Sequence, residues 1–112
     1  MTPSIINKTH NVFGLKAGDL QNIIAVILQH AEVEEGIIFG SRAKGNYKTG
    51  SDIDIVLKGA GISRETIGNI SYILNEETQM PYKFDILNYH TIANADLVKH
   101  IDRAGVSFYK RG

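Results

Sequence analysis

Hydrophobic residues in the first third of the chain recur at helical spacing. Between residues 17 and 30 they fall three or four positions apart, on one side of a helix: Leu20, Ile23, Ile24, Ile27 and Leu28. A stripe of this kind is typical of an amphipathic helix that packs its apolar face on a sheet. The preceding residues, 1–13, show no such periodicity, and we expect them to form a loosely held lead-in.

Strands are predicted where the spacing shortens. Residues 36–39 form a short apolar run, which is typical of a buried strand. In residues 52–57 the pattern alternates, and Asp52 and Asp54 share one face of the predicted strand, opposite Ile53, Ile55 and Leu57. A polar loop rich in turn-forming residues, 46–51, precedes this strand.

The second half of the chain continues the alternation of helix and strand. Ser63 is a suitable N-cap for a helix with the core stripe Ile67, Ile70 and Leu74. Residues 82–88 predict a third strand, in which Asp85 lies on the face opposite Tyr82, Phe84 and Ile86. A last helix is predicted over residues 91–104, followed by a short edge strand at 106–109.

The order of these elements predicts a fold of the α/β (α+β) class, in which helices cover a small mixed β-sheet. The length of 112 residues suits one domain, residues 1–112, with a modest core. Residues 1–13 lack the basic start and the unbroken apolar run of a signal peptide. No apolar stretch is long enough to cross a bilayer. We therefore expect a cytoplasmic protein without membrane partners.

The charge balance narrows the classes of ligand. Lys+Arg and Asp+Glu each total 12, so the formal net charge is zero. Proteins that grip long nucleic acids usually carry a basic excess, because contacts with phosphates dominate that affinity. We therefore expect no long nucleic acid as a partner, whereas a single nucleotide is compatible with this balance. The chain has no cysteine, which excludes disulfides and thiolate chemistry.

The aspartates predict a metal site. Asp52 and Asp54 are two residues apart on a strand, so their side chains leave the same face about 7 Å apart at the backbone. Asp85 occupies the corresponding face of the third strand, and pairing of the two strands would place it beside them. Carboxylate oxygens are the ligands that Mg²⁺ prefers. Two such ions about 4 Å apart can hold the attacking and leaving oxygens of a phosphoryl displacement.

A phosphate site is predicted at the end of the first strand. Gly40 lets the backbone approach a ligand closely, and the next residues can open a helical turn whose N–H groups favour anions. Ser41 adds a hydroxyl donor and Arg42 a guanidinium for phosphate oxygens, with Lys44 as a second cation. Gly40, Ser41 and Arg42 are therefore the predicted nucleotide-binding residues.

The combination Gly40-Ser41-Arg42-Ala43-Lys44-Gly45, followed by Gly50-Ser51-Asp52-Ile53-Asp54, resembles the signature of the DNA polymerase β-like nucleotidyltransferase superfamily. The motif sequence is similar to that of the superfamily's small prokaryotic branch, the minimal nucleotidyltransferases. The resemblance extends from about Leu15 to about Tyr109. It implies a polymerase β-like palm fold. It also implies that Asp85 is the third catalytic carboxylate, which completes the metal site and helps to deprotonate the acceptor.

The resemblance further implies an Mg²⁺-dependent transfer of a nucleoside monophosphate, AMP from ATP, to a hydroxyl group, with Asp52, Asp54 and Asp85 as the catalytic residues. Minimal nucleotidyltransferases are commonly paired with a small helical HEPN protein in a toxin–antitoxin system, in which they act as antitoxin and modify a tyrosine of the toxin. A hetero-oligomer with a HEPN-type protein is the expected assembly.

Two alternatives stay open at this point. The chain could neutralise a partner by contact alone, with the nucleotide site as a sensor or structural brace. It could also be an aminoglycoside nucleotidyltransferase that acts as a homodimer, although 112 residues leave little room for an acceptor-binding half. Substitution of the aspartates separates the first alternative from an enzyme, and an antibiotic-modification assay tests the second.

Overall fold

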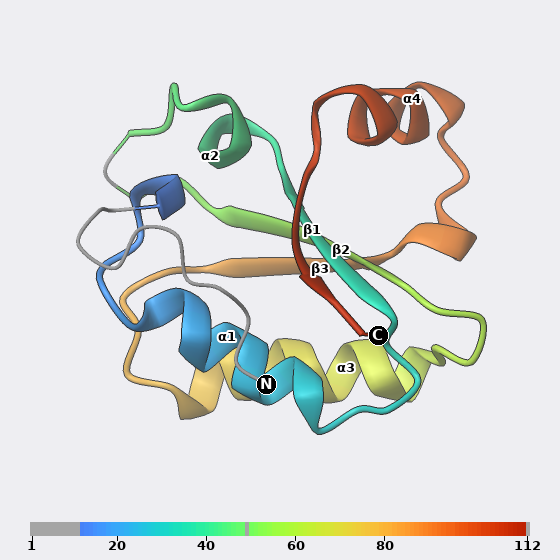
Figure 1. The fold of residues 1–112 in the computed structure, drawn as a ribbon, viewed down its shortest axis with the longest axis horizontal. Helices are drawn as coiled ribbons and strands as arrows, with labels where there is room; N and C mark the ends of the chain where they lie inside the picture. The colour runs from blue at the N-terminus through green and yellow to red at the C-terminus, as the bar shows by residue number, and fades with distance from the viewer. Residues whose placement is uncertain (1–11, 49, 112) are drawn as a thin grey trace.

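A computed structural model describes residues 12–48 and 50–111, and a four-stranded mixed sheet forms their centre (Figure 1). The strands are β1 (Glu35–Phe39), β2 (Ile53–Lys58), β3 (Phe84–Asn88) and β4 (Val106–Lys110). Their order in the sheet is β3-β2-β1-β4. β1 pairs antiparallel with β2 and β4, whereas β2 pairs parallel with β3. The predicted mixed sheet is confirmed, and β4 lies at an edge as expected.

Helices lie on both faces of this sheet. In Figure 1, α1 and α3 lie on one side, and α2 and α4 lie on the other. The α-helices are α1 (Asp19–Leu28), α2 (Ser41–Lys44), α3 (Arg64–Tyr72) and α4 (Ala95–Ala104). Shorter turns are η1 (Val12–Gly14), the π-helical η2 (Ile73–Glu77) that continues α3, and η3 (Tyr89–Thr91).

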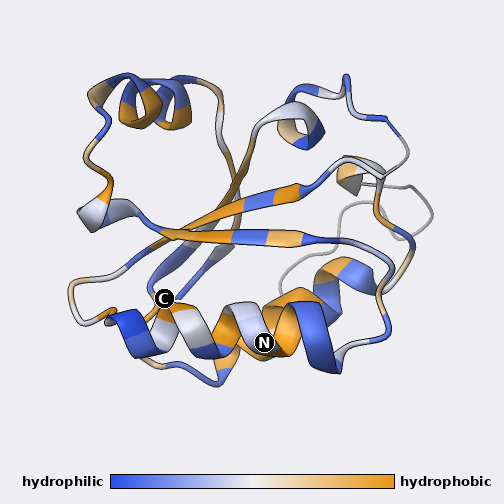
Figure 2. Ribbon diagram, turned by 180° about the vertical axis from the view of Figure 1, so that it is seen from behind, coloured by the Kyte–Doolittle hydropathy of each residue, from blue (hydrophilic) through white to orange (hydrophobic). Residues whose placement is uncertain are grey.

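The two faces of the sheet bury different clusters of apolar side chains. The larger cluster joins the strands to α1, α3 and η2, and includes Ile23, Ile27, Ile53, Ile55, Leu57, Ile70, Leu74, Phe84 and Ile86. The smaller cluster joins the opposite face to α4 and includes Ile37, Phe39, Val56 and Ile101. In Figure 2 the central strands are coloured largely as hydrophobic, with hydrophilic segments between. The alternation predicted for β2 therefore sets the larger core.

Local signals in the sequence explain where the helices begin. The Ser63 hydroxyl accepts from the Thr66 N–H at 3.1 Å, and the Thr66 hydroxyl accepts from the Ser63 N–H at 3.2 Å, which forms a capping box. The Thr66 hydroxyl also donates to Glu32 at 2.7 Å, which ties α3 to the turn before β1. The predicted N-cap at Ser63 is confirmed.

The predicted helix over 91–104 is wrong in its first turn. Residues 89–91 form the separate turn η3, in which the Asn88 side chain accepts from the His90 N–H. α4 begins later, because the Asn94 side chain accepts from the N–H groups of Asp96 and Leu97. Asparagine is among the strongest N-cap residues, so the signal for this start was present in the sequence.

The lead-in predicted over residues 1–13 falls largely on residues 1–11, which lie outside the described residues. Phe13, at the end of that segment, belongs to η1, and its carbonyl accepts from Arg42. The part of the lead-in that the structure describes is therefore tied to the rest of the fold. Over the described ranges, no helix has both the length and the apolar character needed to cross a membrane.

Asn75 closes the outer edge of β3, which has no neighbouring strand among the residues that the structure describes. Its side-chain oxygen accepts from the Phe84 N–H at 2.8 Å, and its side-chain nitrogen donates to the Phe84 carbonyl at 3.0 Å. The same nitrogen donates to the Ser71 carbonyl at 3.0 Å. One amide group thus pairs with β3 as a neighbouring strand would, and unpaired edges of this kind otherwise invite pairing with another chain.

Replacement of Asn75 by alanine is expected to lower the free energy of unfolding by about 2–3 kcal/mol, because two backbone groups of the buried Phe84 lose their partners. Chemical denaturation measures this loss. Ser71→Ala is the matched control: it removes a 3.3 Å contact with the same amide but leaves the bonds to Phe84, so its expected cost is about 0.5 kcal/mol or less. Equal losses in the two variants would contradict the role of Asn75 at the strand edge.

Candidate functional site

The three predicted carboxylates lie on the same face of the sheet. In β2, Asp54 alternates with residues of the larger core and shares its face with Val56 of the smaller cluster. In β3, Asp85 stands between two residues of the larger core, on the face of Leu87. Asp52 precedes β2 in the same phase as Asp54. The apolar end of this face is covered by α4, and the acidic residues occupy its other end.

The parallel pairing brings Asp54 and Asp85 side by side. They are direct partners in the register of β2 and β3. Asp52 and Asp85 are exposed, whereas Asp54 is half-buried. Burial of Asp54, followed by the negative charges of Asp85 and Asp52, raises the pKa of its carboxyl above the ordinary value. The middle carboxylate therefore carries an electrostatic cost that a bound cation would relieve.

Gly40 joins the end of β1 to this acidic group. Phe39, the last residue of β1, is the register partner of Asp54. Gly40 then turns with φ 78° and ψ −154°, a conformation available essentially to glycine. A Cβ atom at this position would lie 2.5 Å from Oδ2 of Asp54. The glycine thus places the backbone that leads into Ser41 and α2 directly against the middle carboxylate, and the two halves of the sequence motif meet there.

Arg42 is placed differently from Gly40 and Ser41. Its side chain is only 4% exposed. Its guanidinium donates to the backbone carbonyls of Ser51, Phe13 and Gly14. These bonds direct Nε, Nη1 and Nη2 of the guanidinium at backbone carbonyls. We therefore leave Arg42 out of the proposed phosphate contacts, which stay with Gly40, Ser41 and the exposed Lys44.

The chemistry of the aspartates fits a divalent cation. Across residues 12–48 and 50–111, no three His, Cys, Asp or Glu side chains are gathered closely enough to hold a metal ion as they stand. The donor set nevertheless supplies oxygen ligands alone, which is what Mg²⁺ requires, and its members are close enough to act on the pKa of Asp54. Cation binding at Asp52, Asp54 and Asp85 would require their side chains to turn toward one another.

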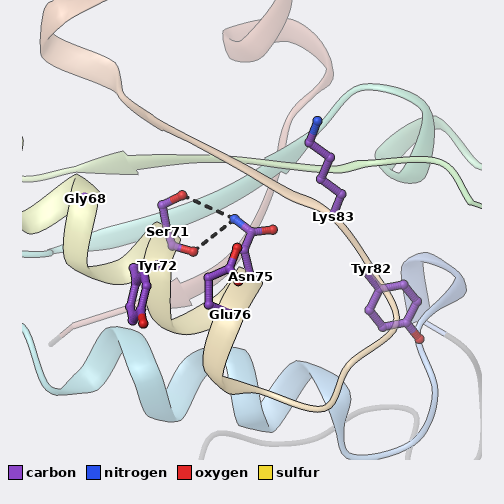
Figure 3. Close-up of a pocket in the computed structure, with 7 residues that line it drawn as sticks. All are labelled: Gly68, Ser71, Tyr72, Asn75, Glu76, Tyr82 and Lys83. Atoms are coloured by element: carbon purple, nitrogen blue, oxygen red, sulfur yellow. Dashed lines mark hydrogen bonds between the residues drawn. The ribbon is translucent and has the colours of Figure 1, made fainter.

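A pocket of about 650 Å³ lies away from these residues, between α3, η2 and the segment before β3 (Figure 3). It is lined by Gly68, Ser71, Tyr72, Asn75, Glu76, Tyr82 and Lys83. Figure 3 shows the Lys83 side chain extending away from Asn75 and Glu76. The hydrogen bonds of Asn75 hold this wall together. None of Gly40, Ser41, Asp52, Asp54 and Asp85 lines this pocket, so it is separate from the predicted site.

Comparison with solved structures identifies the fold. A toxin–antitoxin complex crystallised with AMP-PNP contains a chain that is 18% identical, with a TM-score of 0.70 over 83% of this chain and 74% of that one. A mutant of the toxin–antitoxin pair MntA–HpeT gives 15% identity and a TM-score of 0.67, with coverage of 83% and 74%. A complex of tri-AMPylated Shewanella oneidensis HEPN toxin with MNT antitoxin gives 16% and 0.62, with coverage of 82% and 70%. At these identities the likeness establishes the fold.

Comparison of sequences identifies the family. No curated protein matches the chain. Residues 21–112 match the family described as polymerase beta, nucleotidyltransferase. The matched stretch contains all three aspartates and the Gly40-Ser41 turn that lies against Asp54. This chain therefore belongs to the polymerase β nucleotidyltransferase family.

Proposed function

We propose that the chain transfers AMP from ATP, in an Mg²⁺-dependent reaction, to a tyrosine hydroxyl of a HEPN-type toxin and thereby acts as its antitoxin. The contact that supports the reaction is the one between Gly40 and Asp54, because it sets a phosphate-binding turn against a group of three carboxylates. A phosphate chain bound at the turn would bring its α-phosphorus to the acidic end of the sheet.

Each residue has a separate part in this reaction. Asp52, Asp54 and Asp85 would hold the Mg²⁺ ions, which when bound neutralise the phosphate oxygens and stabilise the developing charge. Ser41 and Lys44 would bind the β- and γ-phosphates through a hydroxyl and an ammonium group. Asp85 is exposed and can therefore approach an incoming acceptor. The acceptor oxygen forms a bond to the α-phosphorus, its proton passes to Asp85, and the bond to pyrophosphate breaks.

The choice of acceptor is supported by the similar structures. The three relatives described above are toxin–antitoxin complexes, and in one of them the HEPN toxin carries three AMP groups. The open acidic face of this chain suits a macromolecular acceptor, because Asp52 and Asp85 are exposed. A partner protein would then supply the hydroxyl group and the surface that surrounds it.

One observation favours the second candidate, an antitoxin that acts by contact without catalysis. The carboxylates of the described residues are not gathered as a ready-made metal group. If this candidate is correct, the Asp52→Asn protein protects cells from the toxin as well as the wild type does. If transfer is the protective step, the same variant fails to protect.

The experiment that tests the proposal uses ATP labelled on its α-phosphate, with Mg²⁺, and the purified product of the neighbouring open reading frame. We expect the label to appear on a tyrosine of the neighbour in the presence of this protein, and to disappear with Asp52→Asn or with EDTA. Label on neither protein, despite measurable ATP binding, would contradict nucleotidyl transfer to the neighbour. Label on an aminoglycoside instead would replace the proposed acceptor.

A further inference from the structure

We propose that Arg42 is a positioning residue that fixes Asp52, by clamping the loop before β2 to the turn before α1. The proposal rests on the proposed function, in which Asp52 binds the activating cation. Arg42 is an unusual residue to bury, since arginine is rarely enclosed without a partner for its charge. Here the hydrogen bonds of its guanidinium go to main-chain carbonyls, so the side chain acts on the course of the backbone.

One side of the clamp is the residue directly before Asp52. Nε and Nη2 of Arg42 donate to the Ser51 carbonyl at 3.1 and 2.9 Å. Ser51 is held further by Lys48, whose N–H donates to the Ser51 hydroxyl at 2.8 Å and whose carbonyl accepts from the Ser51 N–H at 2.9 Å. The bidentate contact thus fixes the peptide that leads into Asp52, while the carboxylate itself stays exposed.

The other side of the clamp is the turn η1. Nη1 of Arg42 donates to the Phe13 carbonyl at 3.0 Å and to the Gly14 carbonyl at 3.4 Å. Phe13 has φ 58° and ψ 21°, a left-handed conformation that costs a non-glycine residue free energy. Such a conformation persists where surrounding contacts impose it, and the bond from Arg42 is one of these contacts. This turn lies before the stretch that matches the family.

Two aromatic rings enclose the guanidinium. The centroids of the Tyr47 and Tyr82 rings each lie 5.2 Å from Cζ of Arg42, within the range of a cation–π contact. Tyr82 is itself held by a 2.7 Å bond from its hydroxyl to Asp19 at the start of α1. The clamp therefore joins the loop to the turn η1 directly and to α1 through Tyr82.

Two variants test the clamp from its two sides. Arg42→Lys keeps the charge but cannot make the bidentate bond to Ser51. Gly14→Ala substitutes none of the site residues and keeps Arg42 itself, but its Cβ would lie 2.5 Å from Cε1 of Tyr47 and 2.9 Å from Nη1 of Arg42, so the guanidinium must shift. The control is Gly18→Ala: Gly18 has a positive φ of 90°, and Gly14 one of 73°, but nothing lies within 4 Å of a Cβ added at Gly18.

The readouts are the affinity for Mn²⁺, measured by electron paramagnetic resonance without nucleotide, and the kcat and KM of transfer. For Arg42→Lys and Gly14→Ala we expect the affinity for Mn²⁺ and kcat each to fall by about 10- to 100-fold, with the KM for ATP little changed. For Gly18→Ala we expect the wild-type affinity for Mn²⁺ and the wild-type kcat, whatever its melting temperature. Because Mn²⁺ binding is measured without turnover, a failure of the proposed transfer reaction would leave this test intact.

Three results would overturn the clamp. Wild-type affinity for Mn²⁺ in both Arg42→Lys and Gly14→Ala would show that Asp52 does not depend on it. A rise in the KM for ATP in Arg42→Lys, with unchanged Mn²⁺ affinity, would assign Arg42 to phosphate binding instead. The absence of Mn²⁺ binding in the wild-type protein would remove the cation that the clamp is proposed to serve.

Discussion

Asp54→Asn is expected to slow nucleotidyl transfer by at least about 100- to 1,000-fold, because it removes the central carboxylate of the site and with it several kcal/mol of stabilisation in the transition state. The same variant is expected to fold at least as stably as the wild type at neutral pH. Asp54 is half-buried, with Asp52 and Asp85 as negatively charged neighbours. Its ionised form therefore costs stability, and asparagine does not.

The pH dependence follows from the raised pKa of Asp54. Because the folded state holds this proton more tightly than the unfolded chain does, the stability due to the neutral carboxyl is fully present below the ordinary aspartate pKa. It is lost as the pH rises through the raised pKa of the folded state. The melting temperature of Asp54→Asn relative to wild type, in metal-free buffer, should therefore be higher at about pH 7 than at about pH 4.

Mg²⁺ provides the control for this prediction. A cation bound by the folded state should raise the melting temperature of the wild type at neutral pH, and should do so less in Asp54→Asn. Differential scanning calorimetry of both proteins at both pH values, with and without Mg²⁺, gives the melting temperatures for these comparisons. A variant that transfers AMP at the wild-type rate would contradict the catalytic role. If Asp54→Asn melts several degrees below the wild type at neutral pH in metal-free buffer, the ionised Asp54 carboxylate does not destabilise the fold as proposed.

Gly40→Ala is expected to lower transfer by about 100-fold, because displacement of a reacting group by about 1 Å has an effect of this size. The added Cβ would meet Oδ2 of Asp54 at 2.5 Å and its Cγ at 3.5 Å, so the carboxylate must move. The backbone conformation of Gly40 adds a cost of about 1–3 kcal/mol to folding. Transfer kinetics and chemical denaturation together measure the two effects.

Gly18→Ala separates the two effects of the Gly40 variant. Gly18 also has a positive φ, 90°, but it lies before α1 with nothing within 4 Å of the added Cβ. Its variant should lose stability by about 1–2 kcal/mol and keep its transfer rate. If Gly40→Ala loses stability but transfers as fast as Gly18→Ala does, the contact between Gly40 and Asp54 has no role in catalysis.

The strand phases could be predicted because they follow from local alternation. Ile53, Ile55 and Leu57 enter the larger core, and Asp54 faces the other side, as the period of two requires. The pairing of Asp54 with Asp85 could not be predicted, because register and direction depend on contacts distant in the sequence. The alternation leaves the direction of pairing open, and the structure has β2 and β3 parallel.

The place of Arg42 could not be predicted for a different reason. A cation after Gly-Ser indicates a phosphate ligand, whereas its partners in the structure are the carbonyls of Phe13, Gly14 and Ser51. Every residue has a backbone carbonyl, so the residue types in the sequence do not identify which carbonyls bind Arg42. The two tyrosines were the signal available: Tyr47 in the loop and Tyr82 before β3 both stack on Arg42. Neither was assigned a role from the sequence.

One face of the sheet has an apolar end under α4 and an acidic end outside it. This division matters for cells that contain both active and inactive copies of the protein. Substitutions among the aspartates leave the buried clusters untouched, so an inactive copy keeps its folded surface. Under the proposed function, such a copy would still occupy the toxin that an active copy must reach. Inactive variants would then act as competitors in a cell that also carries the active protein, and one defective allele would interfere with the other.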